Sequence, residues 1–252
     1  MPTFAQLKQA KNLPIIGRGQ KKVMVALPVY DKPEVETVVA LFNLLFTTRH
    51  SHQLATRTSS LISRARSFLA QQAIDQNFDY LLFIDGDMVF PHDAMDKLID
   101  RGVDIVSGLT TTRQPPFLPT IGKFQYDEAG HPIGVGSILN YPDSDLFQVD
   151  SVGMAFTLIS RKALDTMKAK YGKRGLFQQI PLDNGGDLPE DSSFCWRAKE
   201  CGLKVHVDTS IGILHKGSQL FGERDYKDFQ QSLIADASKK EGQSEGPKPP
   251  TT

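Results

Sequence analysis

Cysteine is scarce in this sequence, because its 252 residues include only Cys195 and Cys201. Two cysteines are too few for a disulfide-stapled secreted domain or for a cysteine-based zinc site. No apolar run approaches the roughly 18 residues that cross a membrane, and the N-terminus lacks the apolar core of a signal peptide. These absences exclude several protein classes and predict a soluble, cytoplasmic protein.

The sequence also lacks an excess of charge of either sign. Lys plus Arg and Asp plus Glu both number 29, which gives a formal net charge of zero. Bulk electrostatic coating of a nucleic acid is therefore disfavoured, although a local patch could still contact phosphates. One candidate patch, which is otherwise an ordinary solvated helix end, contains Arg161, Lys162, Lys168, Lys170, Lys173 and Arg174.

Most of the chain has the composition of one globular domain. Hydrophobic residues make up 40% of it, which is ordinary for a folded protein. Residues 1–22 are polar and basic and are expected to form a lead-in. Residues 239–252 have no apolar periodicity and are rich in Pro, Gly and Lys, so we expect a disordered tail. The domain should therefore span residues 23–238.

Strand and helix signals alternate through the first half of this domain. Apolar strands are predicted at 23–27, 80–84 and 103–106, and a helix with its apolar face on Val35, Val38, Val39, Phe42 and Leu45 follows the first. A second helix should begin after a cap at Ser59 or Ser60. The alternation predicts an α/β fold with a mostly parallel sheet, helices on both faces and a more mixed second half.

The clearest chemical motif is Asp85-Gly86-Asp87, at the end of the apolar strand YLLFI. Ligands of open α/β sheets collect beyond the carboxyl ends of strands. Two carboxylates separated by one glycine can approach the same divalent cation, and magnesium often uses only one or two carboxylates plus substrate phosphates. The alternative is a simple strand-ending turn, because Asp and Gly both favour turns.

A second feature is the absence of acidic residues between Glu36 and Asp75, a stretch that contains several arginines and histidines. Arg57 precedes the predicted second helix and Arg64 lies about one turn inside it. A helix N-terminus with nearby arginines suits a diphosphate. Arg66 is expected to lie on the solvated face.

Two further candidates come from the second half of the chain. Glu190 and Asp191 open a predicted helix, where acidic side chains complement the helix dipole, but a carboxylate beside the glycine-rich stretch 183–187 could also be a general base. His215 follows an apolar strand. A lone histidine is more often structural, yet together with Asp87 it would suit manganese.

Taken together, these features resemble the GT-A fold glycosyltransferases, in particular the family 2 group and its short bacterial and bacteriophage relatives. The similarity covers about residues 23–216. The matching pieces, in order, are Ala26–Tyr30, the arginine-bearing segment Arg57–Arg66, the DxD motif in Phe83–Met88, Val152–Ala155, Glu190-Asp191 and His215.

The resemblance implies a single Rossmann-like GT-A domain and a metal-dependent sugar transfer from a nucleoside-diphosphate sugar to an acceptor hydroxyl. The residues implied to bind the donor are Pro28, Tyr30, Arg57, Arg64, Asp85 and Gly86, and those implied to bind Mn or Mg are Asp87 and His215. Asp191 would abstract the proton, and Glu190 would orient either Asp191 or the acceptor. The residues implied to contact the acceptor are Gly153, Met154 and Trp196. The acidic pair fits an inverting reaction. The segment His50–Thr58 has no carboxylate, unlike the uracil pocket of typical family 2 enzymes, so a UDP-sugar is the expectation only by resemblance.

Several alternatives stay open. The acceptor could be a hydroxymethylated pyrimidine in phage DNA, which would place the protein in the host cytoplasm, or a saccharide or lipid-linked glycan. A nucleotidyltransferase usually has a glycine-rich signature after the first strand, whereas this chain has the segment Pro28–Pro33 there. An inactive nucleotide-sugar-binding module is the third possibility, and the oligomeric state is not predicted.

Overall fold

A central seven-stranded sheet organises the computed structural model, which describes residues 21–183, 185–217 and 220–242. The strand order is β2-β1-β3-β10-β5-β13-β8. Five strands are parallel, and β10 and β8 run antiparallel to their neighbours. The bounds are β1 Lys22–Val29, β2 Ser51–Thr58, β3 Tyr80–Ile84, β5 Ile105–Gly108, β8 Leu146–Val149, β10 Phe156–Ser160 and β13 Val205–Asp208. The predicted α/β class with a mostly parallel sheet is confirmed, and the architecture is that of a single Rossmann-like domain.

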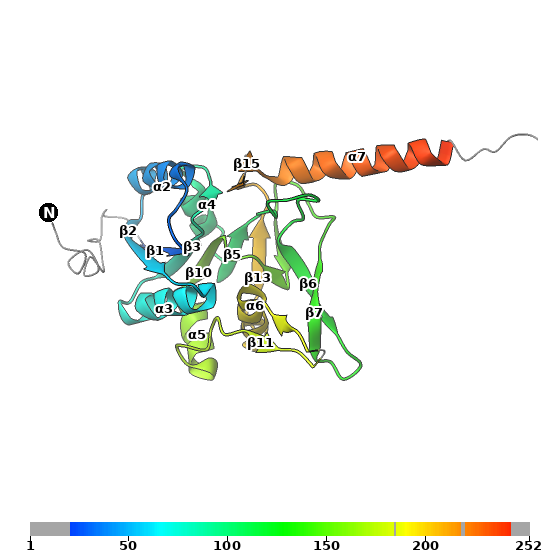
Figure 1. The fold of residues 1–252 in the computed structure, drawn as a ribbon. Helices are drawn as coiled ribbons and strands as arrows, with labels where there is room; N and C mark the ends of the chain where they lie inside the picture. Colours follow the sequence, from blue (N-terminus) through cyan, green and yellow to red (C-terminus); the bar gives the residue numbers. More distant parts are fainter. Residues whose placement is uncertain (1–20, 184, 218–219, 243–252) are drawn as a thin grey trace, which may run out of the picture.

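Helices cover both faces of the sheet, so that it separates two apolar cores (Figure 1). One core contains side chains of α3 (Ile62–Asp75), α5 (Arg161–Tyr171) and α6 (Glu190–Glu200). The other contains side chains of α2 (Val35–Thr47) and α4 (Ala94–Asp100). Strand β3 is apolar throughout because both of its faces are covered.

Helix α2 buries a different face from the one expected. Its buried residues are Thr37, Ala40, Leu41 and Leu44. Val35, Val39 and Phe42 of the predicted face are exposed instead. The helix is apolar on nearly every side, so the spacing of apolar residues could not identify the side that meets the sheet.

The edge strand β2 and the start of α3 also differ from expectation. The sequence of Ser51–Thr58 has no clear strand pattern, but these residues pair in parallel with β1 along its whole length. Leu61 is the N-cap residue of α3, without a side-chain cap, and its N–H donates to Ser59 Oγ at 3.2 Å. The polar and small residues of β2 do not form the apolar pattern that predicts a strand, because this edge strand is only partly buried.

Short sheets and a long helix complete the molecule. They are the sheet of β7 (Pro132–Ser137), β6 (Ile121–Tyr126) and β9 (Ser151–Val152), the sheet of β15 (Leu220–Phe221), β14 (Leu214–Lys216) and β4 (Met88–Val89), the pair β11 (Ile180–Pro181) and β12 (Asp187–Leu188), and helix α7 (Glu223–Gly242). Helix α7 projects from the body (Figure 1) and includes residues 239–242 of the expected tail. Residues 1–20 and 243–252 lie outside the described part of the chain. No helix in the described ranges is long and apolar enough to cross a membrane.

Candidate functional site

The DxD turn lies at the carboxyl end of β3, between β1 and β10 in the sheet. The backbone N–H of Asp85 donates to the Ala155 carbonyl at 2.9 Å. The Gly86 carbonyl accepts from the Glu34 N–H at 2.7 Å and from Thr37 Oγ1 at 3.1 Å. A Cβ on Gly86 would lie only 3.3 Å from the Pro33 Cα, so glycine permits this close approach of the turn to the start of α2.

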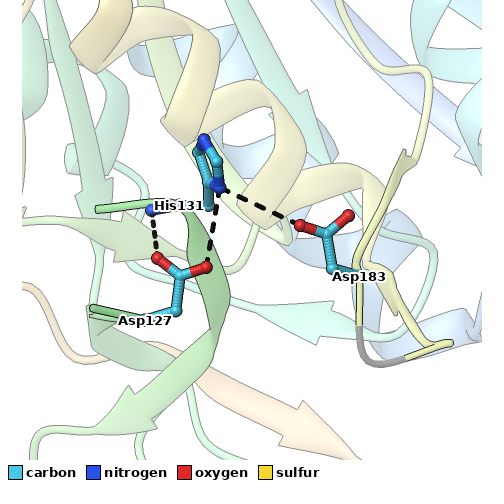
Figure 2. A group of neighbouring side chains, drawn as sticks. All are labelled: Asp127, His131 and Asp183. Carbon is cyan, nitrogen blue, oxygen red and sulfur yellow. Dashed lines mark hydrogen bonds and ion pairs between the residues drawn. The ribbon is translucent and has the colours of Figure 1, made fainter. Parts of the chain in front are cut away.

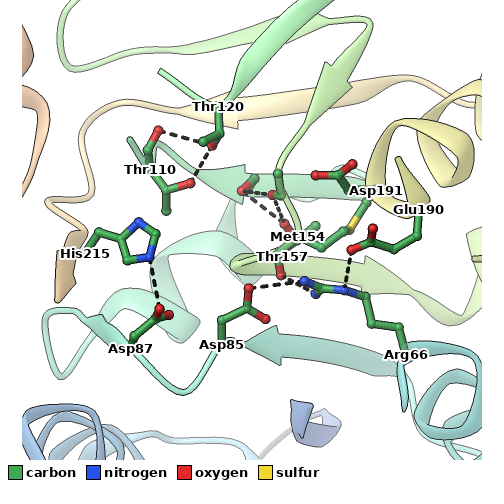
Figure 3. A network of polar contacts seen from close by, with 12 residues as sticks. Arg66, Asp85, Asp87, Thr110, Thr120, Met154, Thr157, Glu190, Asp191 and His215 are labelled. Carbon is green, nitrogen blue, oxygen red and sulfur yellow. Dashed lines mark hydrogen bonds and ion pairs between the residues drawn. The ribbon is translucent and has the colours of Figure 1, made fainter. Parts of the chain in front are cut away.

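Asp87 and His215 come together although 128 residues separate them in the sequence. Strand β4 pairs with β14, and the Lys216 N–H donates to the Asp87 carbonyl at 2.7 Å. The pairing brings His215 Nε2 to 3.1 Å from Asp87 Oδ2 (Figure 3). His215 Nδ1 lies 2.8 Å from the Thr111 carbonyl, which can only accept, so the proton of this hydrogen bond is on Nδ1.

This pair fits a divalent cation. With Nδ1 protonated, His215 would bind a cation through Nε2 once the proton shared with Asp87 is lost, and a backbone carbonyl that orients a histidine in this way is the usual support of a metal ligand. Two ligands that bind one cation at about 2.1 Å and at right angles lie about 3.0 Å apart. The observed separation of 3.1 Å is that of a hydrogen bond between the two side chains and is also close to that value, so Asp87 and His215 together could hold Mn or Mg.

Arg113 also contacts the metal-ligand candidate Asp87. Its Nη1 lies 3.1 Å from Asp87 Oδ2, and its side chain is 56% exposed. Burial opposes ionisation of Asp87, but the hydrogen bond and charge of His215 and the charge of Arg113 outweigh burial, so the pKa of Asp87 is lowered. Sequence analysis missed Arg113, because nothing in the local pattern of the segment after β5 indicates that it reaches the DxD turn.

The arginine at the centre of the site is Arg66, which corrects the expectation that it is solvated. The residue is only 4% exposed. Its Nη2 lies 3.1 Å from Asp85 Oδ2, its Nε lies 3.4 Å from Glu190 Oε1, and its Nη1 donates to the Met154 carbonyl at 3.1 Å (Figure 3). The sequence places Arg64 and Arg66 two residues apart on α3, and the sheet covers only the side that carries Arg66.

Asp191 lies in the first turn of α6, beside Glu190. Its Oδ1 accepts from the Ser192 N–H at 2.7 Å. Burial, and secondarily the charge of Glu190, raise the pKa of Asp191, and this exceeds the opposing effects of the Ser192 hydrogen bond and of Arg66. A carboxylate with a raised pKa is suited to general-base chemistry.

A shallow hollow opens beside Asp191, between the small β7-β6-β9 sheet and the start of α6. Its lining includes Thr120, Val135, Ser151, Gly153 and Asp191. A Cβ on Gly153 would lie 2.9 Å from Thr120 Oγ1, so glycine keeps this side of the hollow open. Thr120 Oγ1 is in turn 2.5 Å from Thr110 Oγ1 (Figure 3).

The other two residues expected on the acceptor side do not line this hollow. The Met154 side chain is 1% exposed within the core, and only its carbonyl reaches the site, through Arg66. Trp196 packs edge-to-face on Phe124, with ring centroids 5.1 Å apart, and also contacts Tyr126. The side chains of Met154 and Trp196 therefore pack against other parts of the protein and do not face the hollow.

The remaining expected donor residues lie at or near the same edge of the sheet without joining the network around Arg66. Pro28 is buried in β1, paired with Arg57 of β2. Tyr30 is 78% exposed. The Arg57 guanidinium lies 4.3 Å from the Phe68 ring centroid, and Arg64 is exposed on α3. Their role in donor binding remains a prediction.

The basic patch, on α5 and the residues that follow it, lies at the opposite edge of the sheet from the DxD turn. Arg161, the first residue of α5, donates through its N–H to the Asp79 carbonyl, just before β3 begins. Four of the six cations form ion pairs with carboxylates: Arg161 with Asp165, Lys162 with Asp104, Lys170 with Glu200 and Lys173 with Asp75. A nucleic-acid acceptor thus has no support from this patch.

A second group of possible metal ligands lies far from the sequence motifs. Asp127 and His131 flank the β6–β7 turn, and Asp183 belongs to the turn between β11 and β12 (Figure 2). His131 Nδ1 lies 3.5 Å from Asp127 Oδ2 and 3.9 Å from Asp183 Oδ2. The three side chains could together bind a divalent cation, but His131 and Asp183 are largely exposed and such ion pairs are common on surfaces.

Comparison with known proteins places the chain by its fold alone. No protein-family model and no curated protein matches the sequence. The crystal structure of A197 from STIV, a viral protein, is similar over 78% of this chain and 86% of its own, with a TM-score of 0.51 and 14% identity. A Bacillus anthracis structure named "Putative Glucose-1-Phosphate Thymidylyltransferase", in complex with a sucrose, covers 75% and 89% at 11% identity, but its TM-score of 0.36 is too low to carry an argument. The likeness to A197 supports the α/β fold, and the activity has to be argued from the site.

Proposed function

We propose that this protein is a metal-dependent glycosyltransferase, which moves a sugar from a nucleoside-diphosphate sugar to an acceptor hydroxyl. The observation that carries the proposal is the pair of Asp87 Oδ2 and His215 Nε2, 3.1 Å apart, in the same polar site as Asp85 and the Glu190-Asp191 pair. Segments from both halves of the chain supply these groups. Mn or Mg bound by Asp87 and His215 would supply electrostatic stabilisation of the leaving diphosphate.

Asp85 supports the donor side of the proposal. Its Oδ2 is held by Arg66, while its Oδ1 is buried and has no hydrogen-bond partner among the described residues. A buried carboxylate oxygen without a partner is costly, and a hydroxyl donor would satisfy it. In the proposed complex Oδ1 accepts from a ribose hydroxyl, and Arg113, which contacts Asp87, neutralises charge that develops on the diphosphate.

Asp191 supports the acceptor side. An acceptor hydroxyl in the hollow would lie against this carboxylate, whose pKa is raised by burial. The acceptor oxygen attacks the anomeric carbon, the bond from that carbon to the diphosphate oxygen breaks, and its electron pair leaves with the diphosphate. Asp191 takes the hydroxyl proton. A single displacement of this kind inverts the anomeric configuration.

The test combines ligand binding with hydrolysis. Wild-type protein is titrated with a panel of nucleotide sugars, with and without Mn or Mg, and thermal stability and released sugar are recorded. A ligand that binds only the folded state raises its stability by mass action. We expect a metal-dependent stabilisation by one donor, and slow hydrolysis of the same donor by water.

Asp87→Asn should abolish the metal dependence of donor binding, and Asp150→Asn is a matched control. Both carboxylates are 26% exposed and both pair with a cation, but Asp150 pairs with Lys199 outside the site. Unchanged metal-dependent binding in Asp87→Asn would refute the metal assignment. Donor binding without any hydrolysis or transfer would indicate a binding module, and pyrophosphate release from a nucleoside triphosphate and a sugar phosphate would indicate a nucleotidyltransferase.

A further inference from the structure

Arg66 joins three segments that the proposed reaction uses. Its guanidinium contacts the carboxylate of Asp85 at the end of β3, the carbonyl of Met154 before β10, and the carboxylate of Glu190 at the start of α6. These contacts span both halves of the chain. In Figure 3 the side chain of Arg66 extends from α3 between Asp85 and Glu190.

Arg66 is the cation that compensates the negative charge of the carboxylates around it. Asp85, Glu190 and the nearby Asp191 would place three negative charges around one buried guanidinium. The planar fork of arginine can contact two carboxylates and a carbonyl at once, which the single ammonium group of lysine cannot do in the same geometry. The Arg66 side chain is 5% exposed, so solvent screens these charges weakly.

We propose that Arg66 is a positioning residue that couples the donor site to the acceptor base, an inference that rests on the proposed function. Arg66 holds Oδ2 of Asp85 and so fixes the orientation of the carboxylate whose buried Oδ1 lacks a hydrogen-bond partner among the described residues. Through Glu190 it fixes the first turn of α6, and its charge favours the ionised form of Asp191. Loss of Arg66 therefore weakens donor binding and also makes Asp191 harder to ionise.

The test uses Arg66→Met and Arg66→Lys, with Arg197→Met as a matched control. Arg197 is also buried, at 8% exposure, but its Nη1 donates only to the carbonyls of Leu176 and Gln178 among the contacts that the structure describes. The probe is the nucleotide sugar of the panel that stabilises the wild-type protein, and its affinity, the kcat of its hydrolysis and the pH profile of that hydrolysis are measured for each folded variant. A structural role would lower thermal stability without moving the pH profile.

For Arg66→Met we expect weaker donor binding and a fall in kcat of about 10²-fold, because the catalytic groups would be misplaced. The acid limb of its pH profile should move to higher pH. Arg66→Lys should restore the position of the acid limb, because it keeps the charge, without restoring kcat. Arg197→Met should lose stability and keep the wild-type pH profile.

Wild-type kcat and an unmoved acid limb in Arg66→Met would overturn the inference. If Arg66→Met does not fold, Arg66→Lys decides alone, and hydrolysis at the wild-type rate by that variant overturns it. Failure of the proposed function is seen separately, because wild-type protein would then show neither metal-dependent donor binding nor hydrolysis.

Discussion

Replacement of Asp191 by asparagine should inactivate the protein and stabilise it at the same time. Burial and the charge of Glu190 raise the pKa of Asp191, so the folded state disfavours its ionised form. The amide of the asparagine would keep an oxygen for the Ser192 N–H, which in the native protein donates to Oδ1 at 2.7 Å. The substitution therefore removes an unfavourable charge without removing that hydrogen bond.

The expected changes in Tm and in rate for Asp191→Asn follow from general values. Each unit of pKa difference between the folded and unfolded states corresponds to about 1.4 kcal/mol. In a domain of roughly 150–250 residues, 1 kcal/mol shifts Tm by about 2–4 °C, so a gain of a few degrees is expected for Asp191→Asn near neutral pH. Loss of a general base lowers the rate by about 10²- to 10⁴-fold.

The sign of the pH dependence is fixed by the direction of the shift. The destabilisation by Asp191 is absent below its unfolded pKa, grows as the pH rises through the folded pKa, and is complete above it. The Tm advantage of Asp191→Asn should thus be largest near neutral pH and shrink toward pH 4, about the unfolded pKa of an aspartate. Transfer by the wild-type protein should be lost as the pH falls through the raised pKa.

Glu190→Gln provides a control, because its effect on stability should be opposite to that of Asp191→Asn. Glu190 is paired with Arg66 at 3.4 Å, so its neutralisation should destabilise the protein by roughly 1–3 kcal/mol near neutral pH. Thermal unfolding from pH 4 to 8 and steady-state transfer would be measured for both variants. Near-wild-type transfer by Asp191→Asn would refute the base assignment, and a lower Tm than wild type near neutral pH would refute the electrostatic reasoning.

Two further predictions concern cations on opposite sides of the molecule. Arg113→Ala should raise the donor KM by about 10- to 100-fold, which corresponds to the free energy of a charged hydrogen bond. Its effect on the free energy of unfolding should be less than about 0.5 kcal/mol, because the side chain is largely exposed. An unchanged KM would exclude Arg113 from donor binding. Joint reversal to Lys170→Glu and Lys173→Glu should leave acceptor KM and its salt dependence unchanged, because both lysines are ion-paired at the far edge of the sheet. A large rise in acceptor KM, measured by steady-state kinetics, would restore a role for the patch.

Local patterns in the sequence are enough to predict the fold class and the positions of the main chemical motifs along the chain. An apolar strand that ends in Asp85-Gly86-Asp87 is recognisable without a structure, because burial on both faces of a sheet demands continuous apolar residues and carboxylates can only follow where the strand emerges. Glu190 and Asp191 were likewise identifiable at the start of a helix. These properties are set by residues close together in the sequence.

Packing, by contrast, selects which of several neighbouring residues enter the site. Arg64 and Arg66 have the same local chemistry, but the packing of α3 on the sheet exposes one and buries the other between Asp85 and Glu190. Helix α2 likewise has apolar residues on both faces, and its contacts with the sheet select one.

The same limit applies to pairs that lie far apart along the chain. The pairing of β4 with β14 creates the contact between Asp87 and His215, and no local pattern contains it. Burial and long-range pairing depend on the whole chain, so they settle what local spacing leaves open.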